Sequence, residues 1–203
     1  MKKQQTGLGC LGTIVWGTPI LAIILIILFW GIRVNNKSIE REETVYQKWA
    51  QVENTYQLRF DLIPNLMSVV KQYAEHEKAT FIAVTEARSK LVGIKINSKN
   101  LTKQNIKDFE AAQQQLGNAI DRLLVVVEKY PELKANQNFI ELQYELKNIE
   151  KLILSARIEY NDVVKTYNAY IRKFPRNLFA KLLGFETKGY FESNTEAAQS
   201  PKI

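Results

Sequence analysis

The feature that most constrains this chain is an uncharged, strongly apolar run near its N-terminus. No Asp, Glu, Lys or Arg occurs between Lys3 and Arg33, a stretch of about 29 residues whose centre reads ILAIILIILFW. About 20 consecutive apolar residues in a helix are enough to cross the hydrocarbon core of a bilayer. The sequence therefore predicts a short N-terminal segment over residues 1–10 and a transmembrane helix over residues 11–32.

Residues around the run favour an anchor that stays attached. Trp16 and Trp30 flank its most apolar part, and indole rings prefer the headgroup region of a membrane. The alternative is a cleaved signal peptide, because the start MKK resembles a charged leader. We disfavour it because no small-residue cleavage pattern follows FWGIRVNN. The cations on the two sides of the run slightly favour a cytoplasmic body.

After the anchor, apolar residues recur at helical spacing and predict an all-α body. The clearest stripe alternates steps of three and four residues, as in helices that pack lengthwise on near-parallel neighbours. Its members are Phe139, Leu142, Leu146, Ile149, Ile153, Ala156, Tyr160, Val163, Tyr167, Tyr170 and Phe174. Such stripes need partners, so the region 33–191 is predicted to form an antiparallel up-and-down four-helix bundle. The expected helices cover residues 36–60, 64–92, 103–130 and 138–174, followed by a short basic amphipathic segment at 176–185 and a disordered tail at 192–203.

The stretch RFDLIPNL leaves two geometries open. Pro64 fits the first turn of a new helix, with Ile63 extended before it, but it could instead kink one continuous helix. We favour the turn because a continuous helix would leave half of its apolar stripe without partners. Arg59 and Asp61 would then lie at the membrane-distal tip, where they could cap helix ends or contact a soluble partner.

With a turn at Pro64, the last long helix runs back towards the bilayer. The segment NLFAKLLGF would then lie near the lipid, together with the cations Arg172, Lys173, Arg176 and Lys181. Anionic lipid attracts such cations by about 1 kcal/mol each, so these four residues are candidate lipid contacts. In the alternative interpretation the segment caps the open end of the core, and one segment could do both.

The dipeptide Tyr-Asn occurs at residues 160–161 and again at 167–168, seven residues apart and therefore on one helix face. Both tyrosines fall on the apolar stripe, which places them in the core. Asn161 and Asn168 beside them could line a groove that contacts a partner.

His76 is the only histidine and lies between two glutamates, but the sequence offers it no metal site. A structural zinc site takes four ligands, mostly Cys and His. This chain has only one histidine and one cysteine, and that cysteine, Cys10, lies at the membrane edge. We expect His76 at the bundle boundary with one ring nitrogen hydrogen-bonded; the alternative is a pH-sensitive contact. The sequence also has no G-x-S-x-G elbow and no P-loop. It therefore predicts no metal, no cofactor and no enzymatic activity.

Three long motifs carry a family resemblance. RFDLIPNLMSVVKQYAEHEK, LLVVVEKYPELKANQNFIELQYEL and ARIEYNDVVKTYNAYIRKFPRNLFAKLLGF occur in this order, and from about Arg33 to Phe191 the chain resembles the bacterial LemA family. The resemblance implies a single-pass protein of the bacterial inner membrane whose helical body lies on the cytoplasmic side. It implies no reaction.

The function that the sequence favours is a membrane-anchored scaffold or adaptor. Its expected partners are the lipid bilayer and a protein of unknown identity, and a homo-oligomer stays open. Nucleic acid is not expected, because the net charge of +7 is spread along the helices without an aromatic-basic platform. The alternatives are a protein that organises lipid through its basic C-terminal segment and an enzyme of unrecognised type.

Overall fold

The computed structural model describes residues 8–94 and 99–192, with side chains from residue 19 onward. All regular elements in this part of the chain are helices, which confirms the predicted all-α class. They are α1 (Leu8–Tyr73), α2 (Lys78–Val92), α3 (Lys103–Val127), α4 (Pro131–Lys134), α5 (Gln137–Arg172) and α6 (Arg176–Leu182). The expected disordered tail lies, apart from Glu192, outside the described residues.

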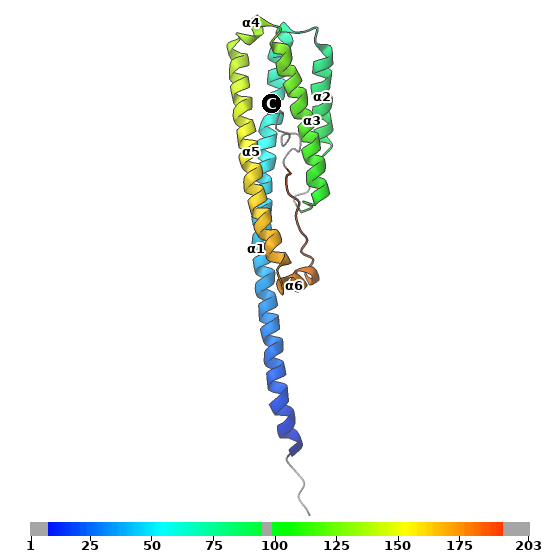
Figure 1. The fold of residues 1–203 in the computed structure, drawn as a ribbon, viewed down its shortest axis with the longest axis vertical. Helices are drawn as coiled ribbons and strands as arrows, with labels where there is room; N and C mark the ends of the chain where they lie inside the picture. Colours follow the sequence, from blue (N-terminus) through cyan, green and yellow to red (C-terminus); the bar gives the residue numbers. More distant parts are fainter. Residues whose placement is uncertain (1–7, 95–98, 193–203) are drawn as a thin grey trace, which may run out of the picture.

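The long helices α1, α2, α3 and α5 lie side by side at one end of the molecule, where successive helices alternate in direction (Figure 1). α1 packs lengthwise on α5, and α2 packs on α3. α2 and α3 are shorter, so α1 and α5 continue without them towards α6 (Figure 1). The N-terminal part of α1 then projects alone beyond the rest of the body (Figure 1).

Most of the apolar stripe predicted for α5 is buried as far as Tyr160. Beyond that point Val164 and Ile171 are buried, whereas Val163 and Tyr170 are only partly buried. A straight α-helix drifts by about 20° per heptad against a strict 3.5-residue repeat, so the buried face moves by one position. Phe174, the last predicted member, lies after α5 and is 79% exposed.

The predicted turn at Pro64 is wrong, because α1 continues unbroken through this residue to Tyr73. The predicted helices 36–60 and 64–92 are therefore one long helix and the short helix α2, and the turn between them lies at residues 74–77. The stripe does find partners, because α5 begins beside the end of α1, where Asn136 donates to the Tyr73 hydroxyl at 3.0 Å. Pro64 itself is exposed, so water can reach the Phe60 carbonyl that lacks its helical donor.

Replacing Pro64 with alanine is expected to raise the free energy of unfolding by about 1–2 kcal/mol. Alanine is roughly 3 kcal/mol better than proline inside a helix, and the looser unfolded chain offsets about 1 kcal/mol of this gain. Urea unfolding of the full chain in detergent, followed by tryptophan fluorescence, measures the change. A variant less stable than the parent would instead indicate a proline that fixes a turn.

Candidate functional site

The short helix α6 packs on α1 at the end of the apolar run. The Trp30 and Phe179 rings meet edge to face with centroids 5.0 Å apart. Gly31 makes this approach possible, since a Cβ there would lie 2.9 Å from Phe179 Cε1. α6 is thereby held at the level where the exposed residues of α1 change from Phe29 and Ile32 to Arg33.

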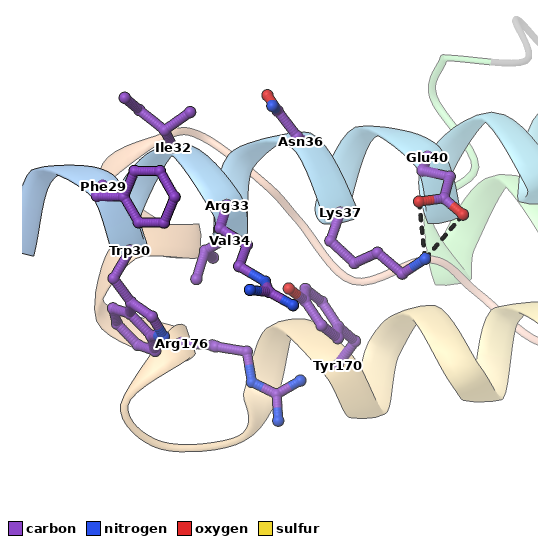
Figure 2. A pocket seen from close by; sticks show the side chains of 10 residues that line it. All are labelled: Phe29, Trp30, Ile32, Arg33, Val34, Asn36, Lys37, Glu40, Tyr170 and Arg176. Atoms are coloured by element: carbon purple, nitrogen blue, oxygen red, sulfur yellow. Dashed lines mark hydrogen bonds and ion pairs between the residues drawn. The ribbon is translucent and has the colours of Figure 1, made fainter.

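A groove of about 680 Å³ opens where α1, the end of α5 and the start of α6 meet (Figure 2). Arg33 reaches from α1 towards Tyr170 of α5, and the Arg176 guanidinium carbon lies 4.4 Å from the centre of the same ring (Figure 2). Lys37 is paired with Glu40 at 2.7 Å. This lysine holds the pKa of the Glu40 carboxyl below its usual value through a hydrogen bond and its positive charge. The remaining lining residues are Phe29, Trp30, Ile32, Val34 and Asn36.

The four cations predicted to contact lipid lie in this region. Arg172 ends α5, Lys173 follows it, and both are exposed. Arg176 is half-buried against Tyr170, and Lys181 is exposed on α6. The same segment exposes apolar side chains, namely Phe174 (79%), Leu178 (61%) and Leu182 (83%). Lipid contact itself stays a prediction. The Trp16 side chain lies outside the described side chains, so its predicted interfacial position also stays a prediction.

Asn161 and Asn168 bind the chain's own C-terminal segment, residues 185–192, which we name the strap. The Asn168 side-chain amide donates to the Lys188 carbonyl and accepts from the Lys188 N–H, both at 2.9 Å. Asn161 makes the same pair of bonds with Phe191, at 2.9 Å and 3.0 Å. In a β-sheet, a neighbouring strand would make this pair of bonds to an extended segment. Here each asparagine side chain makes them instead. The strap fills the space that these side chains face, which leaves no open groove at the two residues.

The strap is also held on its other side. The Gly189 N–H donates to the Leu101 carbonyl at 2.8 Å, and a Cβ at residue 189 would lie 2.8 Å from Lys103 Cα, so only glycine fits without a shift. The buried Lys188 pairs with Glu42 at 2.7 Å. Phe191 enters the aromatic core beside Trp49. The strap was not predicted, because eight residues without periodicity carry no recognisable pattern; the doubled Tyr-Asn was the one available signal.

The paired tyrosines also hold the strap. Tyr160 donates to the Gly189 carbonyl at 3.1 Å and Tyr167 donates to the Glu186 carbonyl at 3.0 Å. Burial raises the pKa of Tyr160, and the negative charge of Tyr190 at high pH adds to the shift. Burial likewise raises the pKa of Tyr167, with a further contribution from the Glu42 carboxylate. The prediction that both tyrosines lie in the core is confirmed.

These raised pKa values predict alkaline unfolding. Above about pH 10 an unfolded tyrosine loses its proton while the folded one keeps it, so the folded state binds more protons and stability falls as pH rises. The double variant Tyr160→Phe/Tyr167→Phe is expected to lose stability less steeply between pH 10 and 12. Circular dichroism of both proteins across this range measures the slopes, and equal slopes would contradict the prediction.

The expected place of Arg59 and Asp61 at the tip is wrong, because both lie within the continuous helix α1. Arg59 is only 5% exposed. It donates to the Gln113 carbonyl at 3.2 Å and to Glu150 at 3.0 Å, and it also contacts the Gln113 side chain. Asp61 is exposed and accepts from the Gln57 amide at 2.8 Å, one helical turn away.

His76 occupies the turn between α1 and α2 and is exposed. None of the hydrogen bonds found among the described residues involves its ring, although one was expected. Glu77 beside it pairs instead with Lys129 at 3.7 Å. Among the side chains that the structure describes, no group of three or more His, Cys, Asp or Glu is placed to hold a metal ion.

The chain is similar to known proteins along most of its length. The model of the LemA family matches residues 48–203. Magnetosome proteins MamQ 1 and MamQ 2 of Paramagnetospirillum magneticum AMB-1 are each 29% identical to this chain over 185 residues, covering 83% of it and 68% of the relative. MamQ of Magnetospirillum gryphiswaldense MSR-1 matches with the same identity and coverage. The family and these relatives point to a non-catalytic protein, and with the apolar helix they indicate association with a membrane.

Proposed function

The chain belongs to the LemA family, and we propose that it is a membrane-anchored helical scaffold that recruits a protein partner. In this proposal α1 crosses the bacterial inner membrane once, and the other helices complete an antiparallel four-helix bundle in the cytoplasm. The protein performs no reaction of its own. It acts by holding its partner at a fixed place relative to the bilayer.

Helix α1 supports the anchoring. It is long and apolar enough to cross a membrane, and residues 20–29 are exposed although almost all of them are large and apolar. The relatives are named as magnetosome proteins, which also fits a place at a membrane. Because α1 has no break between the apolar part and the body, a partner bound to the body would be held at a defined distance from the bilayer.

The observation that carries the recruiting role is a second stripe on α5, on the side opposite the core. We name it the outer stripe: Ile140, Tyr144, Lys147, Lys151, Leu154 and Ile158. Its members alternate steps of four and three residues, as a coiled-coil seam does. The apolar members are 44% to 69% exposed, so this seam is unoccupied within the described part of the chain.

The outer stripe fits a partner helix of defined chemistry. Apolar residues lie at both ends of the stripe and two lysines lie at its centre. A matching helix would carry apolar residues at its ends and acidic residues at its middle, so that the lysines pair as they enter the seam. We propose such an amphipathic, centrally acidic helix of another protein as the occupant.

Crosslinking in intact membranes, followed by purification under denaturing conditions and mass spectrometry, tests the proposal. The parent is compared with a chain whose residues 1–28 are replaced by an unrelated membrane helix. Trp30 and Gly31 must stay in this variant, because α6 packs on them. A foreign protein crosslinked in stoichiometric yield to both chains is the expected result.

The outer stripe is tested by Leu154→Ser/Ile158→Ser, which should lower the crosslinked yield several-fold. Leu152→Ser is the matched control, because Leu152 is a 51% exposed apolar residue of the same helix that lies off the stripe. Crosslinks only between copies of this chain would contradict the adaptor role and indicate a scaffold that assembles with itself. Crosslinks only to lipid would overturn the recruiting role.

The exposed apolar residues on α6 and just before it favour a second candidate, a protein that organises lipid at the membrane surface. Phe174, Leu178 and Leu182 accompany exposed cations, as in interfacial amphipathic segments. Charge reversal at Arg176 and Lys181 distinguishes the two functions. Loss of membrane effects with the crosslinked partner retained would favour lipid organisation, and the opposite result would favour recruitment.

A further inference from the structure

The groove in Figure 2 combines an apolar edge with a cationic edge. One edge is apolar, formed by Phe29 and Ile32 at the end of the exposed apolar part of α1. The other edge is cationic, formed by Arg33, Lys37 and Arg176. A ligand that fits both edges carries hydrocarbon next to a negative charge.

The charges in the groove are not balanced. Lys37 is neutralised by Glu40, one turn further along α1. Among the ion pairs of the described residues none involves Arg33 or Arg176, and Glu40 is the one carboxylate in the lining. Two guanidinium groups are thus available for an anion, and guanidinium binds phosphate oxygens through paired N–H donors.

The elements around the groove fix its position along α1. The contact of Phe179 with Trp30 holds α6 against α1 at the point where the apolar run ends. Tyr170 lies beneath both the Arg176 and the Arg41 guanidinium groups, at 4.4 Å and 4.9 Å from the ring centre. Arg176 is thereby positioned before any ligand arrives. If α1 spans the bilayer, the groove opens at the boundary between hydrocarbon and headgroups.

We propose that this groove is a binding site for one anionic phospholipid. Its phosphate lies between Arg33 and Arg176, and an acyl chain runs along Phe29 and Ile32 into the bilayer. The site acts as a clamp that joins α1, α5 and α6 through the lipid, so it also orients the body on the membrane. This inference rests on the membrane anchoring proposed above, but not on the recruitment of a protein partner.

The test uses the full chain in nanodiscs that contain one part phosphatidylglycerol to nine parts phosphatidylcholine. Gentle release into detergent and native mass spectrometry then count the lipids that stay bound. One uncompensated cation near a membrane attracts anionic lipid about fivefold, so two cations should enrich phosphatidylglycerol about 25-fold over the bulk ratio. The variant Arg33→Gln/Arg176→Gln should reduce this enrichment to within about twofold of the bulk ratio.

A matched control separates the groove from the general positive charge of this surface. Lys173→Gln/Lys181→Gln removes the same charge from exposed residues of the same region that do not line the groove, and it should keep the enrichment. Arg33→Lys/Arg176→Lys keeps the charge and should retain at least half of the phosphatidylglycerol enrichment. Unchanged far-UV circular dichroism confirms that each variant is folded.

The outcomes distinguish this inference from the anchoring on which it rests. If the parent chain does not float with vesicles, both the anchoring and the lipid site are wrong. If it floats but the groove variant and the control variant lose phosphatidylglycerol equally, only the lipid site is wrong. Equal displacement of the bound lipid by millimolar inorganic phosphate and by phosphatidylglycerol vesicles would indicate a phosphate site in place of a lipid site.

Discussion

Replacing Phe191 with alanine is expected to lower the free energy of unfolding by about 3 kcal/mol, the largest single effect in the strap. The side chain is only 5% exposed. Its ring stacks on Trp49 at 6.1 Å and meets Tyr160 edge to face at 5.4 Å. Truncating a buried phenylalanine costs about 3–5 kcal/mol, because transfer free energy is lost and a cavity remains. The lower value applies here, because the strap can detach while the helices stay folded. The loss in the free energy of unfolding then cannot exceed the free energy that holds the strap in place.

Urea unfolding of the full chain in detergent measures this loss, and amide exchange shows where it arises. The N–H groups of Lys188, Gly189 and Phe191 should exchange faster in the variant, because each donates to a partner outside the strap. Tyr190→Ala is the control, since this neighbouring ring is 40% exposed and should cost less than about 1 kcal/mol. Equal losses in the two variants would contradict the role assigned to Phe191.

The all-α class was predictable from the sequence because apolar periodicity is a local signal that each helix carries by itself. The end of the predicted helix 64–92 was predictable for the same reason, because α2 ends at Val92. The continuity of α1 at Pro64 was not. Proline strongly disfavours a helix interior, so the local sequence favours a break at Pro64. Only the position of α5, more than 70 residues further along, shows that α1 has a packing partner both before and after Pro64.

The candidate sites show the same limit. Arg172, Lys173, Arg176 and Lys181 were grouped from composition. In the structure they lie at the end of α5 and on α6, which packs on α1 where its apolar part ends. Arg33 and its groove were missed, because Tyr170 and Arg176 meet it only through the packing of α6 on Trp30. The strap was missed because its bonds are made by side chains to an irregular backbone, and such pairings have no sequence period.

Replacing Arg59 with alanine is expected to lower the free energy of unfolding by about 2–3 kcal/mol. The loss comes mainly from the buried contacts with Gln113, whose side chain is left without its donor in a core position. The ion pair with Glu150 adds little, because that carboxylate is 48% exposed and its attraction is screened by water. Urea unfolding of the full chain in detergent measures the difference.

The double variant Arg59→Met/Gln113→Leu decides whether this arginine serves stability or recognition. It removes both buried polar partners while keeping volume, so its stability should lie within about 1 kcal/mol of the parent. If Arg59 only joins α1 to α3 and α5, the double variant should give the same yield of the crosslinked partner as the parent. A lost partner with stability retained would return Arg59 to the contact surface. That result would require α3 to move aside when the partner binds, because Gln113 covers the guanidinium group in the structure.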